Sequence, residues 1–177
     1  MNYLNKFYKN TIRKDFINKF YCKNIKKIPR IEKIVLNFKF KTLNVKQIAS
    51  SLLAYELIVK QRGIITRSKK SNILLKIKKG NPTGCKVTLR KKQAFLFIDY
   101  FLNEILINVK GFSNFELSKL KKSKALTYNI KNLFEFKELK QQYYFFNSLS
   151  NFKITFLSTS KTAKEFIFII NTLNFPL

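Results

Sequence analysis

Hydrophobic residues recur at three- and four-residue steps in four segments of the chain, a spacing typical of amphipathic helices. The first segment lies within residues 1–27, and its apolar positions are Leu4, Phe7, Tyr8, Ile12, Phe16, Ile17 and Phe20. The second follows Asn44, a favourable N-cap residue, and runs through Lys60. Its apolar face is formed by Ile48, Leu52, Tyr55 and Val59. We expect Gly63 to end this helix.

The other two helical segments are residues 91–109 and 162–173. Residues 91–109 have the widest apolar stripe, which consists of Phe95, Ile98, Phe101, Leu102, Ile105 and Val109. Between the two segments we expect a polar loop at residues 111–124, and the pattern assigns no element to residues 131–150. The chain therefore contains helices at both ends and two more in its interior.

Alternation of apolar and polar residues, or short apolar runs between turn residues, predicts β-strands in the remaining chain. The predicted strands are residues 30–38, 64–67, 73–77, 85–90, 125–130 and 153–157. Helices and strands in irregular succession, with several hairpin-length returns, predict an α+β fold: a mostly antiparallel sheet with helices packed on one face and a long basic loop between two strands. There is no internal repeat and no linker, so we expect one domain over residues 1–177, with an N-terminal helix at 1–27 and an α+β core at 28–177.

Charge adds a partner to this picture. The chain has 36 Lys and Arg residues against 9 Asp and Glu, a formal net charge of +27, and such a surplus calls for a polyanionic partner. Between residues 57 and 98 every charged residue is a cation. We expect Gly80, Pro82 and Gly84 to fix a rigid bend there, from which lysine tips and backbone N–H groups reach phosphates. Phosphate neutralisation is favoured over a merely solvated lysine-rich surface.

Catalytic and metal chemistry find little support. The chain has no His, the usual general base and metal ligand, and its two cysteines, Cys22 and Cys85, are isolated. Asp99 and Glu104 lie five residues apart with no His or Cys partner. We therefore predict no enzyme activity, no catalytic or metal-binding residue and no cofactor. No uncharged run approaches the 18 or so residues of a membrane span, so we predict no membrane partner.

Four blocks of the chain resemble the bacterial-type large-subunit ribosomal protein five family. They are IPRIEKIVLN (28–37), IITRSKKS (64–71), KKGNPTGCKVTLR (78–90) and ITFLSTSKT (154–162). The N-terminal helix and the ending NFPL are also similar to that family, so the resemblance covers nearly the whole chain. It implies an α+β structural protein of the large ribosomal subunit, in the central protuberance, which binds 5S rRNA where the ribosome retains it and the neighbouring large-subunit rRNA.

The resemblance also implies roles for particular residues. Its polar contacts to 5S rRNA match Asn37, Gln61 and Thr88, and further phosphate contacts would come from Arg67, Lys86 and Arg90. The family's loop toward P-site tRNA matches residues 68–83, and its cations here are Lys69, Lys70, Lys76, Lys78 and Lys79. Expected protein partners are small-subunit ribosomal protein thirteen, across the subunit interface, and other proteins of the central protuberance.

Two departures from the family matter. The tip of the loop has Ile73-Leu74-Leu75 where the family usually has Ala-Gly-Phe, and residues 131–150 are less acidic and more aromatic than the family's. The second departure suggests a lineage-specific protein partner. Lys, Ile, Asn and Phe, which share A/T-rich codons, make up about half of the chain. This bias favours a mitochondrion over another organelle or an A/T-rich bacterial cytoplasm. The alternative function is a free-standing basic RNA-binding protein or RNA chaperone.

Overall fold

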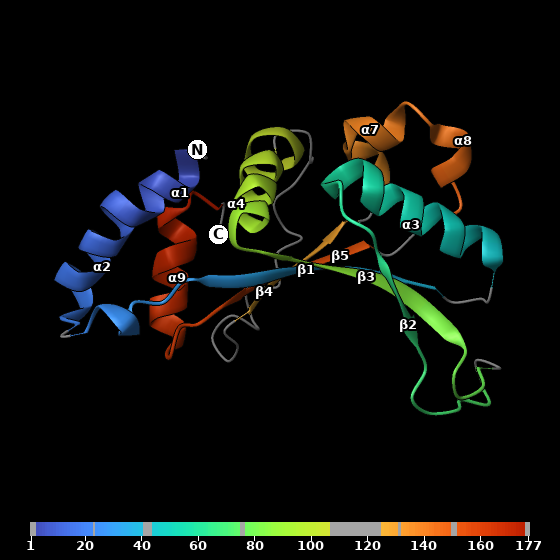
Figure 1. The fold of residues 1–177 in the computed structure, drawn as a ribbon, viewed down its shortest axis with the longest axis horizontal. Coiled ribbons are helices and arrows are strands. Elements are labelled where there is room, and N and C mark those ends of the chain that lie inside the picture. The colour runs from blue at the N-terminus through green and yellow to red at the C-terminus, as the bar shows by residue number, and fades with distance from the viewer. Residues whose placement is uncertain are drawn as a thin grey trace. The chain divides into compact units, whose positions relative to one another are not determined.

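The computed structural model describes residues 3–22, 24–40, 44–74, 77–106, 125–130, 132–149 and 152–175. Figure 1 shows the chain as helices and strands. The N-terminal helical segment consists of α1 (Tyr3–Phe7), the π-helical turn η1 (Tyr8–Ile12) and α2 (Arg13–Phe20). It is followed by the 3₁₀ turn η2 (Ile25–Lys27), strand β1 (Ile31–Lys39) and helix α3 (Val45–Val59).

Strands β2 (Ile64–Arg67) and β3 (Pro82–Arg90) form a hairpin, after which α4 (Lys91–Tyr100) continues into the π-helical turn η3 (Phe101–Ile105). The C-terminal part of the chain contains β4 (Ala125–Ile130), the 3₁₀ turn η5 (Leu133–Glu135), α7 (Lys137–Lys140), α8 (Tyr143–Phe146), β5 (Phe152–Ser158) and α9 (Ala163–Thr172). The predicted elements thus reappear with small shifts at their ends. None of the helices in the described ranges is long and apolar enough to span a bilayer.

The five strands form one sheet in the order β2-β3-β1-β5-β4. Strands β2 and β3 pair antiparallel, with Ile64 opposite Lys86 and Arg67 opposite Pro82, and the register shifts between Thr66 and Arg67. Together with the helices, this sheet confirms the predicted α+β class. The order is not that of the sequence, because β1 lies between β3 and β5.

Contacts divide the chain into two compact units. Unit 1 consists of Met1–Ile34, Leu89–Tyr128 and Thr155–Leu177, and unit 2 consists of Val35–Thr88 and Asn129–Ile154. Strands β1, β3, β4 and β5 each contribute residues to both units. A single domain over residues 1–177 therefore stays a prediction.

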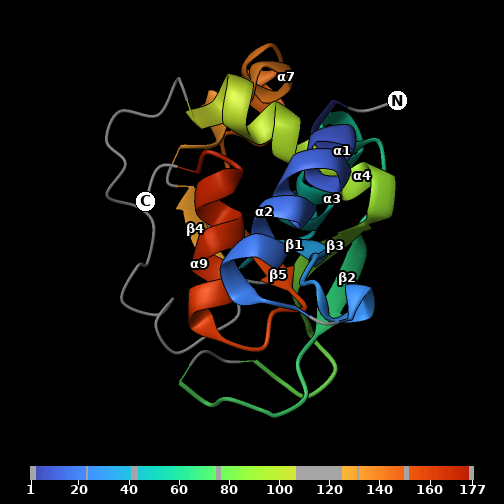
Figure 2. The ribbon, with the colours of Figure 1, turned by 90° about the vertical axis from the view of Figure 1, so that its left-hand side faces the viewer.

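Each unit has an aromatic core. In unit 1, the Phe101 ring lies 5.4 Å from that of Tyr128 and 5.6 Å from that of Phe156. In the same unit α2 and α9 run side by side (Figure 2), and the rings of Phe16 and Phe168 lie 5.9 Å apart between them. Such pairs contribute about 0.5–1.5 kcal/mol each beyond the area they bury.

Unit 2 is built around the Phe152 ring of β5, which lies 4.6 Å from that of Phe38 on β1 and 5.6 Å from that of Phe136. Phe38, Phe136 and Phe152 are all buried. Helices α3, α7 and α8 lie on the same side of the strands (Figure 1). The helices α7 and α8 belong to the segment 131–150, to which the sequence pattern assigned no element.

Several details of the sequence prediction were wrong. Residues 73–77 are not a strand, because the described residues there form only an isolated bridge between Asn72 and Ile77. The helix of residues 45–59 ends at Lys60 in the left-handed conformation (φ 58°), not at Gly63. Its most buried residues are Ser51, Ala54 and Tyr55, one step away from the predicted face, because the β-sheet lies under those positions.

The bend predicted from Gly80, Pro82 and Gly84 is also different. Only Gly80 has the positive φ, +91°, that a tight turn requires. Pro82 is the first residue of β3, so the loop ends two residues before its predicted limit. Gly84 lies inside β3, where a Cβ would be 2.2 Å from the Phe38 carbonyl oxygen. It therefore permits a close approach of β3 to β1. Val109 and the predicted loop 111–124 lie outside the described residues.

Candidate nucleic-acid interface

The open face of the sheet in unit 2 carries the predicted polar residues of β1 and β3. This face lies opposite α3, α7 and α8, and the described part of the chain places no helix of unit 2 on it (Figure 1). Alternation along β1 buries Phe38 and leaves its neighbour Asn37 half-buried on the open face. In β3 the same alternation buries Val87, exposes Lys86 and leaves Thr88 half-buried. Because β1 and β3 are neighbours, the predicted residues share one surface.

Gln61 lies at the edge of this surface. Its Nε2 donates a hydrogen bond to the backbone carbonyl of Thr88 at 3.4 Å, which brings together two residues that are 27 positions apart. Its Oε1 is buried and has no hydrogen-bond donor among the described residues. The predicted association of Gln61 with Thr88 is therefore present, and it leaves one amide oxygen unsatisfied.

The hydroxyl of Tyr55 holds β1 and β3 in place beneath this surface. It accepts a hydrogen bond from the Phe38 N–H at 2.9 Å and lies 2.8 Å from the Cys85 carbonyl oxygen and 3.2 Å from that of Leu36. The tyrosine of α3 thus occupies a gap in the backbone pairing of two strands. Burial raises the pKa of this hydroxyl far above its ordinary value, so it stays a neutral donor and acceptor.

The predicted basic loop is a hairpin with its own hydrogen bonds; we call residues 68–81 the basic hairpin. The Ser68 N–H donates to the Asn81 carbonyl at 2.8 Å, and the Gly80 N–H donates to the Ser68 carbonyl at 3.0 Å. Further out, Asn72 and Ile77 exchange two backbone hydrogen bonds of 2.8 and 3.0 Å. The backbone of the hairpin is therefore paired, and its side chains are free to project.

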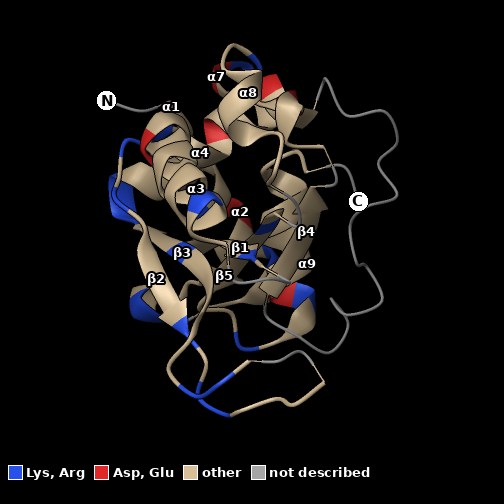
Figure 3. Cartoon of the chain, turned by 90° about the vertical axis from the view of Figure 1, so that its right-hand side faces the viewer, with Lys and Arg blue, Asp and Glu red and all other residues tan. Residues whose placement is uncertain are grey.

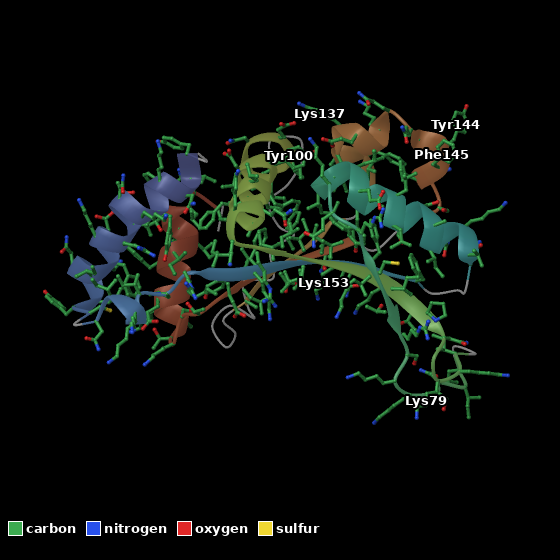
Figure 4. All side chains as sticks on the ribbon, in the orientation of Figure 1. Lys79, Tyr100, Lys137, Tyr144, Phe145 and Lys153 are labelled. Carbon is green, nitrogen blue, oxygen red and sulfur yellow. The ribbon has the colours of Figure 1, made fainter. Side chains whose placement is uncertain are left out.

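The cations of the basic hairpin are exposed. They are Lys69, Lys70, Lys78 and Lys79 (Figures 3 and 4); the fifth predicted lysine, Lys76, lies outside the described residues. No carboxylate lies within ion-pair distance of these four lysines in the ranges that the structure describes. At the base of the hairpin, Arg67 is also exposed, opposite Pro82. The hairpin thus presents unpaired positive charge.

Two apolar residues stand between these cations. Ile73 and Leu74 are 92% and 94% exposed, and the Leu74 N–H donates to the Asn72 side chain at 3.1 Å. These are the residues at which the sequence departs from the resembled family. Exposed side chains of this size at the tip of a hairpin are available for contact with a partner.

Arg90 does not lie with the other five predicted rRNA-binding residues. Asn37, Gln61, Arg67, Lys86 and Thr88 belong to unit 2, whereas Arg90 belongs to unit 1. There it lines a basic pocket together with the first residues of α4. The grouping of all six residues was therefore too simple, because a strand that passes through both units carries Thr88 and Arg90 to different ones.

Sequence reasoning missed a further cation of the open face. Lys153 alternates with the buried residues Phe152 and Ile154 of β5 and lies on the side of the strands opposite α3 in unit 2 (Figure 4). The alternation itself was visible in the sequence. What the sequence did not contain is the position of β5 beside β1, which brings Lys153 onto the same face as Asn37.

The chemistry of these groups suits binding rather than reaction. The described residues contain no group of His, Cys, Asp and Glu side chains that could hold a metal ion. Burial raises the pKa of the Cys85 thiol, which disfavours the reactive thiolate. Neutral donors and acceptors between lysines can contact ribose hydroxyls, base edges and phosphates of RNA.

Comparison with known proteins supports this chemistry. Residues 82–177 match the model of the C-terminus of the ribosomal uL5 family. Along its full length the chain is 35% identical to the large ribosomal subunit protein uL5m of Reclinomonas americana, of which it covers 98%. It is 31% identical to the large ribosomal subunit protein uL5 of Ureaplasma parvum, over 93% of the chain and 90% of that protein. Against uL5 of Clostridium tetani the identity is 32%, over 90% of the chain and 89% of that protein.

Proposed function

The chain belongs to the uL5 family of large ribosomal subunit proteins, and from this premise we propose that it binds 5S rRNA and the neighbouring large-subunit rRNA in the central protuberance and contacts P-site tRNA. As a member of this family it is a structural protein of the large subunit and not an enzyme. The proposal assigns 5S rRNA to the open face of unit 2 and P-site tRNA to the basic hairpin.

One observation carries the assignment of 5S rRNA: the open face combines short neutral side chains with cations on neighbouring strands. Asn37 and Thr88 are half-buried and therefore fixed in direction, whereas Lys86 is exposed. Fixed neutral groups contact 2′-hydroxyls and base edges at defined positions, and lysines neutralise nearby phosphates. Arg67 and Lys153 add charge to the same unit.

The basic hairpin suits a ligand that binds and leaves. Its lysines are flexible point charges that attract a phosphate backbone without selecting a sequence. A tRNA passes through the P site in many different sequences, so a contact by charge alone serves all of them. The exposed Ile73 and Leu74 add a small apolar surface, which would contact a ribose, or small-subunit ribosomal protein thirteen across the subunit interface.

We further propose that the protein works in a mitochondrial ribosome. The bias toward residues with A/T-rich codons and the 35% identity to a protein named uL5m support this location. An A/T-rich bacterial cytoplasm is the alternative, since the relatives from Ureaplasma are bacterial.

A binding and sedimentation experiment tests the proposal. The double substitution Asn37→Ala with Thr88→Ala is expected to lower incorporation of 5S rRNA into the large subunit while the chain still folds. The matched control is Ser50→Ala with Thr172→Ala, which changes two hydroxyl residues on helices. Wild-type chain is expected to sediment with large subunits; recovery only with free or precursor RNA would favour the alternative of an RNA chaperone. Unchanged 5S rRNA content in the double variant would contradict the assignment of the open face.

A further inference from the structure

Six cations line one pocket of about 500 Å³ in unit 1. They come from the N-terminal helical segment, from the residue before β1 and from the junction of β3 with α4: Lys9, Arg13, Arg30, Arg90, Lys91 and Lys92. A single carboxylate, that of Glu32, also lines the pocket, and it lies 3.6 Å from the Lys33 ammonium. None of the six cations is within ion-pair distance of a carboxylate in the described ranges. We call this site the Arg13 pocket.

The walls of the Arg13 pocket are fixed by contacts within unit 1. The Tyr8 hydroxyl donates to the Pro29 carbonyl at 2.6 Å, which ties the N-terminal helical segment to the residue before Arg30. The Tyr8 ring lies 5.8 Å from that of Phe95 on α4, and the Arg13 guanidinium lies over the Tyr8 ring at 5.4 Å. The guanidinium is thereby held in one orientation by a cation–π contact.

Arg30 is positioned just as firmly. Its N–H donates to the Thr159 hydroxyl at 2.9 Å, and its carbonyl accepts from the Thr159 N–H at 2.9 Å. Burial raises the pKa of the Tyr8 hydroxyl, although the guanidiniums of Arg13 and Arg30 beside it act in the opposite direction. The two arginines therefore converge on one buried hydroxyl from different segments of the chain.

Hydrogen-bonding capacity at the pocket is left unused. The Arg13 Nε is buried and has no acceptor among the described residues. Helix α4 begins at Lys91, and its N-cap residue Arg90 makes no side-chain capping hydrogen bond. The first N–H groups of a helix carry partial positive charge and bind anions when no side chain satisfies them. A buried donor without an acceptor costs about 1–3 kcal/mol, a cost that a bound anion removes.

We propose that the Arg13 pocket is a second RNA-binding site, which receives a phosphate group of the ribosomal RNA backbone. The inference rests on the proposed function, since it takes ribosomal RNA as the partner, but it concerns a site in unit 1 that the open face and the basic hairpin do not include. A polyanion is favoured over an acidic side chain because six cations face one carboxylate. The concave shape selects a phosphate that projects from a turn of the backbone, which the guanidinium forks of Arg13 and Arg90 grip in pairs of hydrogen bonds.

The test uses the full-length chain and large-subunit rRNA purified from the native source. Arg13→Gln with Arg90→Gln is expected to weaken binding about 30-fold, because hydrogen bonds to charged groups are each worth about a tenfold change or somewhat more. The slope of log affinity against log salt is expected to become shallower by about two. The matched control is Lys14→Gln with Lys140→Gln, two exposed lysines outside the pocket. It is expected to weaken binding no more than about threefold.

Chemical footprinting gives a second measurement that does not depend on folding of a variant. In isolated large subunits, Lys91 and Lys92 are expected to resist acylation relative to the free chain, whereas Lys140 stays reactive. Reactive Lys91 and Lys92 in intact subunits would overturn the proposal, as would an arginine variant that binds rRNA as the lysine control does. Saturation by inorganic phosphate, with the lysines unprotected by RNA, would assign the pocket to a free anion instead. If the wild-type chain itself fails to bind rRNA, the proposed function fails, not only the pocket.

Discussion

The basic hairpin and the Arg13 pocket both present unpaired cations, but they hold them in opposite ways. The four described lysines of the hairpin are exposed on a short paired turn, and nothing orients their tips. The cations of the pocket come from three distant segments, and a tyrosine and a threonine fix two of its arginines. Charge alone gives attraction that salt weakens, whereas fixed guanidiniums give a defined position on the RNA. We infer that the hairpin serves a transient ligand and the pocket a permanent one.

The largest effect is expected from the glycine that fixes the base of the hairpin. In Gly84→Ala, the new Cβ would lie 2.2 Å from the Phe38 carbonyl oxygen, so β1 and β3 must separate, at a cost of about 3 kcal/mol or more in the free energy of unfolding. Gly80→Ala is the matched control: its φ is +91° but nothing lies within 4 Å, so about 1 kcal/mol is expected. Urea unfolding measures both, and equal losses would contradict the difference between base and tip.

The next effect concerns the frame of the open face. Tyr55→Phe removes the hydroxyl that bonds the Phe38 N–H and the Cys85 carbonyl, leaving buried backbone groups unsatisfied at a cost of about 2 kcal/mol. Tyr144→Phe, at a residue 96% exposed (Figure 4), is expected to change the free energy of unfolding by less than about 0.5 kcal/mol. A Tyr55 variant as stable as the Tyr144 variant would show that the hydroxyl does not hold the strands.

A third substitution separates charge from geometry. Replacing Lys69, Lys70 and Lys79 together by Gln is expected to loosen P-site tRNA and to make the salt dependence of tRNA binding shallower by up to about three, one for each lost phosphate contact. Thermal stability and subunit assembly are expected to stay unchanged, because the three side chains are exposed. Filter binding of tRNA to reconstituted subunits at several salt concentrations measures the effect. Failed assembly would mean that the hairpin, like the pocket, is part of the permanent contact.

The smallest effect is a pH dependence in unit 2. Burial raises the pKa of the Glu135 carboxyl, and its Oε2 has no hydrogen-bond donor among the described residues. The carboxyl therefore contributes stability that is fully present below its unfolded pKa and is lost as the pH rises through its higher folded pKa. Glu135→Gln is expected to remove this fall and to stabilise the chain slightly at neutral pH. Thermal melting across this pH range, with an unchanged slope in the variant, would contradict the assignment.

Most elements followed from local pattern. Alternation located β4 at its exact bounds, and the predicted helix of residues 162–173 is α9, where the Thr162 hydroxyl accepts from the Glu165 N–H in a capping box. The strand predicted at residues 73–77 failed because apolar residues at a hairpin tip mimic a buried run. Helices α7 and α8 escaped prediction because they are one turn each and depend on packing against α3 and β5.

The sequence by itself determined the family, the charge and the face of each strand, because blocks such as GCKVTLR and periods of two and 3.6 residues are local properties of the chain. Only the tertiary structure decided that Arg13, Arg30 and Arg90 meet in one pocket, that the Tyr55 hydroxyl bridges β1 and β3, and that Lys153 joins Asn37 on the open face. These are contacts between residues far apart in the sequence. Strand order and helix packing create them, and no local period encodes either.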